Sequence, residues 1–402
     1  MRVLLSAIGS RGDVQPVMAL ASRLKALGQE VRVCAPPDFR DWIGSLGIPF
    51  TPIGPELTST AKAAAPAAPP TAEQRRQMVE GTVATQFATI PVAAQGCDVI
   101  VVGGYLVVAA RTVAEQMGVP YVFAGYCPTS LPSPQHAPTP LTMLGEKPSD
   151  GTVDNRTLWA RDAERWNDIW GAALNSHRAS AGLAAVTDVR GHMFTAEPWL
   201  AADPTLAPWP EGAGPTVVQT GAWLLPDERP LSPELEAFLD AGDPPVYFGF
   251  GSIRAPQSLG RSMIEAARSL GRRAIVLRGW TDLRLLDDGP DCLSIGEVNQ
   301  QALFRRVAVA VHHGGAGTTT AAALAGAPQV VLPQSYDQHY FAQRVQQLGI
   351  GAAHASGAPT ADSLAEALGQ ALRPDVAADA RRVAAAVRTD GTETAAARLT
   401  CW

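Results

Sequence analysis

The chain has 402 residues, a length that fits two domains of about 200 residues each with a cleft between them. Its 46% hydrophobic and 17% charged residues are typical of well-buried cores, and a net charge of −6 with only 6% aromatic residues argues against a nucleic-acid partner. The five cysteines are scattered, odd in number and without C-x-x-C spacing, so we expect neither a disulfide framework nor a zinc site.

The N-terminal residues MRVLLSAIGSRGDV lack a basic region followed by an apolar run and a cleavage site, and they predict a strand entering a turn. The longest uncharged stretch, Val99–Ala110, contains Gly103 and Gly104 and is well short of the roughly 20 apolar residues of a membrane helix. We therefore predict a cytoplasmic protein without a membrane span.

Strands and helices alternate through the first half of the chain. The predicted elements are a strand at Val3–Ile8, a helix with apolar positions from Val17 to Leu27 that ends at Gly28, strands at Val31–Cys34 and Val99–Val102, a helix at Thr112–Met117, and a strand at Tyr121–Phe123. This alternation predicts a parallel sheet with helices on both faces, which is a Rossmann-like domain.

A Pro-rich, turn-rich segment at 206–232 predicts an interdomain linker. Beyond it the alternation resumes, with strands predicted at Val246–Phe250, Ala274–Leu277, Ala308–Val311 and Val330–Leu332. We therefore predict domains at 1–205 and 233–385, joined by the linker 206–232 and followed by a tail at 386–402.

Two segments interrupt the alternation, the Ala/Pro run at 61–74 and the Pro-studded stretch at 127–141. Both predict long loops. They are either plain surface or, as long loops in compact domains often are, in contact with a substrate.

The most specific segment is VAVAVHHGGAGTTTAAALAGAPQVVLP, a strand followed by a Gly-rich turn and an Ala-rich helix. Glycines let the backbone approach an anion closely, and the free N–H groups and dipole of a helix N-terminus attract phosphate. His313 and Thr318 can add side-chain donors. A purely structural turn is the alternative, and the segment lacks the lysine of a Walker loop.

The sequence HHGGAGTTTAAALAGAPQVVLPQSYDQHYFAQRV resembles the donor-binding signature of the UDP-glucuronosyl/UDP-glucosyltransferase superfamily. Within that superfamily, GSRGDVQPVMALASRL, VQTGAWLLPDERPLSPELEAFLDAG and GEVNQQALF resemble the glycopeptide-antibiotic glycosyltransferases of actinomycetes. The resemblance covers nearly the whole chain and departs only in the two Pro-rich loops and the tail. It implies an α/β chain with the GT-B fold, in which two Rossmann-like domains face across a cleft, with the acceptor on the first and the nucleotide sugar on the second.

The resemblance also implies roles for particular residues. It makes His313, Gly315, Gly317 and Thr318 contacts of the donor diphosphate. Asp337 and Gln338 would hold sugar hydroxyls, and for Asp337 the alternative is a helix N-cap.

Three further donor contacts follow from the same resemblance. Ser252, in the turn after a second-domain strand, would face the pyrophosphate, or else be an ordinary turn serine. Val298 would contact the pyrimidine in place of the tryptophan of many relatives. Trp280 would supply the missing aromatic surface, or else be a buried core tryptophan.

The turn GSRGD follows the first strand and would face the cleft at the carboxyl end of the sheet. The resemblance makes Asp13 the catalytic base that takes the proton of the attacking hydroxyl, with Ser10 and Gly12 close to the donor phosphates and the acceptor. The alternative is that Asp13 caps a helix beginning near Val14.

These observations together predict an inverting transferase that moves a sugar from a dTDP- or UDP-sugar to a hydroxyl of a glycopeptide-like natural product. The nucleotide sugar is a co-substrate, and we expect no further cofactor. No metal is expected because the sequence has no D-x-D pair. We expect a monomer or weak dimer. Two other functions share this architecture: a nucleotide-sugar 2-epimerase and a non-catalytic nucleotide-sugar-binding partner of another transferase.

Overall fold

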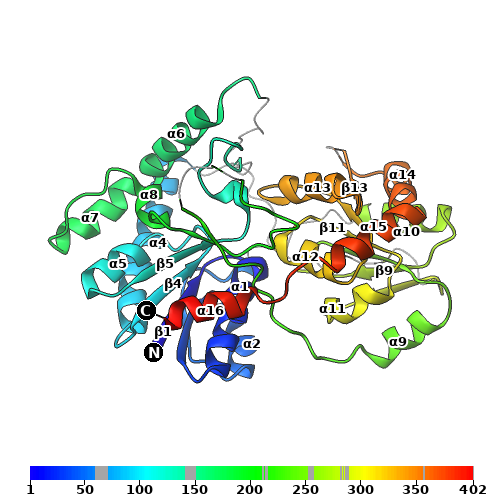
Figure 1. Ribbon diagram of the computed structural model, residues 1–402, viewed down its shortest axis with the longest axis horizontal. Helices are drawn as coiled ribbons and strands as arrows, with labels where there is room; N and C mark the ends of the chain where they lie inside the picture. The colour runs from blue at the N-terminus through cyan, green and yellow to red at the C-terminus, as the bar shows by residue number, and fades with distance from the viewer. Residues whose placement is uncertain are drawn as a thin grey trace.

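The computed structural model describes residues 1–58, 71–140, 151–210, 212, 216–251, 258–280, 283, 285, 289–355 and 358–401. They form two lobes, each a parallel sheet with helices packed on its faces (Figure 1). In the part of the chain that is described, no helix combines the length and hydropathy needed to cross a membrane.

The first lobe is built on a sheet with the strand order β3-β2-β1-β4-β5-β6-β7, all parallel. Its strands are β1 (Arg2–Ala7), β2 (Glu30–Ala35), β3 (Phe50–Pro52), β4 (Val99–Gly103), β5 (Tyr121–Gly125), β6 (Trp199–Leu200) and β7 (Val218–Gln219). Strands β4 and β5 are buried along their whole length, since helices cover both faces, and they therefore read as continuous apolar runs rather than alternating ones.

Helices of the first lobe lie on both faces of this sheet. They are α1 (Arg11–Ala26), η1 (Pro37–Phe39), α2 (Arg40–Ser45), α4 (Ala72–Ala93), α5 (Ala110–Met117), η2 (Pro128–Ser130), α6 (Asn155–Trp166), the π-helical turn η4 (Asn167–Gly171), α7 (Ala172–Ser180) and α8 (Val189–Phe194). Helices α1 and α2 belong to one apolar cluster of the lobe, and α4, α5 and α8 to the other.

The second lobe repeats the plan with the order β10-β9-β8-β11-β12-β13, again all parallel. Its strands are β8 (Val246–Gly249), β9 (Ala274–Leu277), β10 (Cys292–Ile295), β11 (Val309–His312), β12 (Gln329–Val331) and β13 (Gly351–Ala353). Its helices are α9 (Pro233–Asp240), α10 (Ser258–Ser269), α11 (Gln300–Leu303), η5 (Phe304–Arg306), α12 (Ala316–Leu324), α13 (Gln338–Gln347), α14 (Ala361–Ala371) and α15 (Pro374–Ala384).

Both sheets have the doubly wound order of a Rossmann-like domain, as the alternation of strands and helices predicts. In each lobe the order reverses next to the first strand, between β1 and β4 and between β8 and β11. Ligands of such sheets bind outside the carboxyl ends of the strands at this point. The turns that follow β1, β4, β8 and β11 are therefore where a site should lie.

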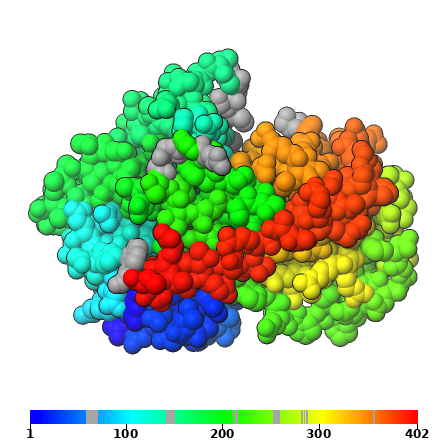
Figure 2. Space-filling view, viewed as in Figure 1, coloured from blue at the N-terminus to red at the C-terminus, as the bar shows by residue number. Residues whose placement is uncertain are grey.

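The chain crosses between the lobes twice. After α15 the chain leaves the second lobe, and the last helix, α16 (Gly391–Thr400), packs on α1 of the first lobe. Figure 2 shows the C-terminal part of the chain, in orange-red to red, running from the second lobe onto the first. The two crossing segments touch at Gly391, where no side chain fits, because a Cβ on Gly391 would lie 2.3 Å from the backbone oxygen of Ala222.

These crossings bear on the expected domain boundaries. The segment 206–232 contains β7, which extends the first sheet, and the segment 386–402 contains α16, which packs on the first lobe. We propose that the first domain comprises residues 1–219 and 391–400.

The two expected loops fall partly outside the described residues. Of the segment 61–74, residues 61–70 are not described and 72–74 already belong to α4, which begins after the N-cap Thr71. Of the segment 127–141, residues 127–140 contain the short turn η2 and otherwise irregular backbone, as predicted, and residue 141 is not described.

Candidate active site

The Gly-rich turn of the second lobe joins β11 to α12. Gly314 has a φ of +94°, and a Cβ there would lie 2.6 Å from Val331 Cγ1, so only glycine fits. The N-cap of α12 is Gly315, which has no side chain to bond the first N–H groups of the helix. These groups, together with exposed Gly317 and half-buried Thr318, form an N-terminus suited to a phosphate.

The two adjacent histidines have different surroundings. The ring of buried His312 accepts the N–H of Gly314 at Nδ1 (3.0 Å) and lies 2.8 Å from Gln329 Oε1 at Nε2, so this histidine shapes the turn. Burial lowers the pKa of His312 to about 4. His313 is only half-buried, but burial and the neighbouring His312 lower its pKa to about 3, so its ring is neutral at pH 7. Its buried Nδ1 has no hydrogen-bond partner among the described residues.

The loop between β12 and α13 carries Asp337 and Gln338. Asp337 lies at the N-cap of α13 but its side chain makes no capping hydrogen bond, which leaves the carboxylate available for a ligand. The Gln338 side chain is buried and accepts the N–H groups of Gln334 (2.8 Å) and Ser335 (3.1 Å), so it fixes the loop. Tyr336, directly before Asp337, has a φ of +55°, a strained value for a residue with a side chain.

In the first lobe, the turn after β1 forms a capping box at the start of α1. Ser10 is the N-cap, and the Asp13 carboxylate accepts the N–H of Ser10 at 2.8 Å. The helix thus begins at Arg11 rather than near Val14, and Asp13 is its third residue rather than its N-cap. Burial raises the pKa of Asp13 to about 6, although the residue keeps some contact with solvent. The carboxylate therefore lies in a recess, with a pKa suited to a general base.

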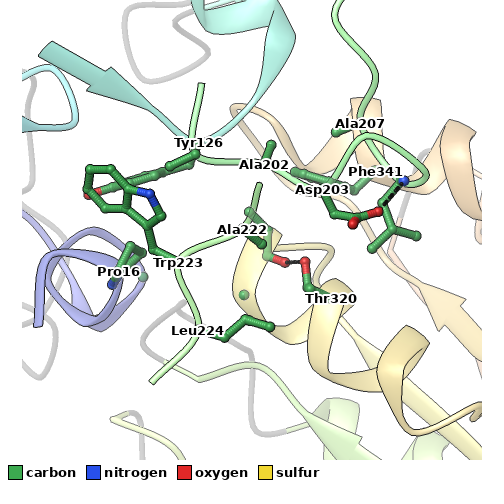
Figure 3. Close-up of a pocket in the computed structure, with 15 residues that line it drawn as sticks. Pro16, Tyr126, Ala202, Asp203, Ala207, Ala222, Trp223, Leu224, Thr320 and Phe341 are labelled. Atoms are coloured by element: carbon green, nitrogen blue, oxygen red, sulfur yellow. Dashed lines mark hydrogen bonds between the residues drawn. The ribbon is translucent and has the colours of Figure 1, made fainter. Parts of the chain in front are cut away.

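The two turns face each other across the lobe boundary. Helices α1 and α12 are in contact, and a small cavity of about 30 Å³ lies between their N-terminal turns. Gly12 and Pro16 line it from the first lobe, Gly317 and Thr320 from the second, and Trp223 from the crossing segment (Figure 3).

The two acidic residues of the site are also close enough to interact. Burial and, after it, the negative charge of Asp13 raise the pKa of Asp337 to about 7, so the two carboxylates belong to one electrostatic site. Among the described residues, no group of three or more His, Cys, Asp or Glu side chains is arranged to hold a metal ion.

Two further candidate donor contacts, Val298 and Trp280, pack against apolar residues. Val298 is half-buried in the turn between β10 and α11 and packs on the core of the second lobe. Trp280 packs against Phe39 of the first lobe, with ring centroids 6.4 Å apart, so it is neither free of contacts nor in the core of its own lobe. Ser252 lies outside the described residues.

Three features of the site do not follow from sequence motifs. Gly104 has a φ of +77° and lies beside the Asp13 carboxylate, since a Cβ on it would be 3.4 Å from Oδ1. Tyr126 contacts the residue that carries this carboxylate. Arg11 forms a 2.8 Å ion pair with Glu297 of the second lobe. For the position of Gly104, the only sequence signal is the Gly-Gly pair at the end of a buried strand, a pattern typical of close backbone approach.

Two family models and several known proteins match this chain. Residues 3–131 match the glycosyltransferase family 28 N-terminal domain, and residues 274–397 match the erythromycin biosynthesis protein CIII-like C-terminal domain. Three Amycolatopsis orientalis proteins are similar: glycosyltransferase GtfE (53% identical, 98% of this chain and 96% of the relative), vancomycin aglycone glucosyltransferase (51%, 99% and 97%) and dTDP-epi-vancosaminyltransferase (45%, 95% and 93%).

Solved structures agree on the architecture. The kitacinnamycin glycotransferase superposes with a TM-score of 0.72 (20% identity, 99% of this chain and 98% of the other), and the calicheamicin glycosyltransferase CalG4 with 0.70 (17%, 100% and 97%). Likeness at this identity shows the fold alone. It confirms the predicted GT-B arrangement of two Rossmann-like domains.

Proposed function

The chain belongs to the glycosyltransferase family of these Amycolatopsis relatives, and from that premise we propose that it transfers a sugar from a dTDP- or UDP-sugar to a hydroxyl of a glycopeptide antibiotic scaffold. The observation that carries the proposal is the meeting of two turns at the lobe boundary. One brings a carboxylate with a raised pKa, and the other brings a helix N-terminus without a capping side chain.

The proposed reaction is a direct displacement at the anomeric carbon. Asp13 takes the proton of the acceptor hydroxyl as its oxygen bonds to the anomeric carbon, and the bond from that carbon to the diphosphate breaks on the opposite face. The leaving diphosphate keeps the electron pair, and the free N–H groups of α12 with neutral His313 donate to it. The sugar configuration is therefore inverted.

The donor sugar would lie between the two acidic residues. The Asp337 carboxylate, which caps no helix, can accept hydrogen bonds from two neighbouring sugar hydroxyls, and Gln338 keeps the loop in shape behind it. We further propose that Val298 faces the pyrimidine, whereas the contact of Trp280 with Phe39 favours an interdomain role for this tryptophan.

The decisive experiment incubates the protein with dTDP- and UDP-sugars and a vancomycin-type aglycone, and reads the product mass. A gain of one sugar is expected, and proton NMR of the product should show an anomeric configuration opposite to that of the donor. Donor incubated alone tests the alternative, because an epimerase would change the sugar without any acceptor. Epimerised donor and unmodified aglycone would overturn the proposal.

A further inference from the structure

A tyrosine outside the motif segments reaches the turn that carries the proposed base. Tyr126 directly follows β5, and its hydroxyl donates a 3.0 Å hydrogen bond to the backbone carbonyl of Asp13 in the first turn of α1. Strand β4 lies between β5 and β1 in the sheet. The hydrogen bond therefore spans the carboxyl edge of the sheet and ties two segments that are far apart in sequence.

The structure leaves room for this side chain at one glycine. A Cβ on Gly103, the last residue of β4, would lie 2.0 Å from Tyr126 Oη and 2.7 Å from Val17 Cγ2. Gly103 thus leaves the space that the phenol occupies, which a larger residue there would fill. At the next residue, Gly104, a Cβ would only touch the Asp13 carboxylate, and it is the φ of +77° that favours glycine there.

The hydroxyl also has the protonation state that this contact needs. Burial and the negative charge of Asp13 raise the pKa of Tyr126 well above its usual value, so the hydroxyl stays protonated and donates throughout the working pH range. The ring lines the cavity between the lobes together with Pro16 and Trp223 (Figure 3).

We propose that Tyr126 is a positioning residue for Asp13, an inference that rests on the proposed role of Asp13 as the base. The capping box at the start of α1 joins Ser10 and Asp13 to each other, but neither of its two hydrogen bonds reaches the sheet. The hydrogen bond from Tyr126 holds the backbone of this turn against the sheet, and so fixes the carboxylate relative to the cleft. Small displacements of a catalytic group are costly because the reaction requires near-attack geometry.

The test is Tyr126→Phe, with Tyr121→Phe as the matched control. Tyr121 is also a buried tyrosine, in β5, but its hydroxyl has no hydrogen-bond partner among the described residues. We expect Tyr126→Phe to lower kcat by roughly 3- to 10-fold, the worth of one net hydrogen bond. The acid limb of the pH profile should move to higher pH, because a loosened turn weakens the hydrogen bonds from Ser10 that lower the pKa of the Asp13 carboxyl. Nucleotide diphosphate affinity should be unchanged, and Tyr121→Phe should leave kcat and the pH profile as they are.

Repeating the substitution in an Asp13→Asn background separates this inference from the proposed function. If Tyr126 acts through the carboxylate, Tyr126→Phe will lower kcat no further in that background. An equal loss in both backgrounds, or an unchanged pH profile in the single variant, would overturn the positioning role and leave the base intact. Full activity of Asp13→Asn alone would instead show that Asp13 is not the base, and would refute the proposed role of Tyr126 as well.

Discussion

Replacing Asp13 by Asn should make the protein more stable and nearly inactive. The Asn side chain keeps the shape and can still accept the N–H of Ser10, which Asp13 accepts at 2.8 Å, but it cannot take a proton. Burial raises the pKa of Asp13 from 3.8 to about 6, so folding disfavours the ionised carboxylate. One pKa unit corresponds to about 1.4 kcal/mol, which sets an upper bound near 3 kcal/mol, and partial exposure brings our expectation to about 1–2 kcal/mol.

The sign of this effect depends on pH. Because the folded pKa of Asp13 is raised, its contribution to stability is fully present below about pH 4 and is lost as the pH rises through about 6. The free energies of unfolding of the parent and of Asp13→Asn should therefore be similar at pH 4, and the variant should be the more stable at pH 7.5. Urea unfolding at pH 4, 5.5 and 7.5 measures the difference.

Activity should change in the opposite direction. Turnover by Asp13→Asn should fall by about 10²–10⁴, the usual contribution of a positioned base, with nucleotide affinity almost unchanged. In the parent, kcat/KM should decline as the pH falls through about 6, because the base must be ionised. A variant that is less stable than the parent at pH 7.5 would refute the argument from burial. A variant that retains turnover within tenfold would refute the assignment of the base.

Three further outcomes are expected at the donor side. Asp337→Ala should weaken binding of the complete sugar donor roughly 10- to 100-fold, since hydrogen bonds to charged groups contribute about 1.5–3 kcal/mol. Binding of the free nucleotide diphosphate should weaken far less. Equal losses of affinity for both ligands in calorimetry would contradict a role in sugar recognition. Gly315→Ala should lower dTDP or UDP affinity at least about tenfold, because its Cβ would lie 2.5 Å from His313 Nε2. The control is Gly369→Ala in α14, outside the site, where a Cβ meets nothing within 4 Å, and it should keep both affinity and fold. Nucleotide diphosphate should bind equally well in excess chelator, and affinity that returns only with magnesium would exclude a phosphate site made of backbone N–H groups.

Much of the fold could be predicted because its signals are local. Strands such as β9 at Ala274–Leu277 are apolar runs between turn residues, and the start and end of the buried strands differ from prediction by a residue or two. The strands β6, β7 and β13 have only two or three residues, and they exist because a neighbouring strand offers hydrogen bonds. Nothing in their own sequence distinguishes them from loops.

In the candidate site, too, some residues could be predicted from local sequence and others could not. The turns that carry Asp13 and His313 could be found in the sequence because glycines and capping residues mark the start of a helix after a strand. The contact of Tyr126 could not be found in this way, since its partner is the carbonyl of a residue 113 positions away. The surroundings of Trp280 likewise depend on how the lobes meet, which no local pattern encodes.

Because α16 packs on the first lobe, the two lobes are completed in a fixed order during synthesis on the ribosome. Apolar residues of α16, among them Ala396 and Leu399, share one core cluster with Val17 and Leu24 of α1, so the helix that carries Asp13 is covered by a segment synthesised almost four hundred residues later. The second lobe is continuous in sequence and can close as it emerges. The first lobe, although made earlier, is completed only once the whole second lobe has left the exit tunnel. A nascent chain therefore completes its second lobe before its first.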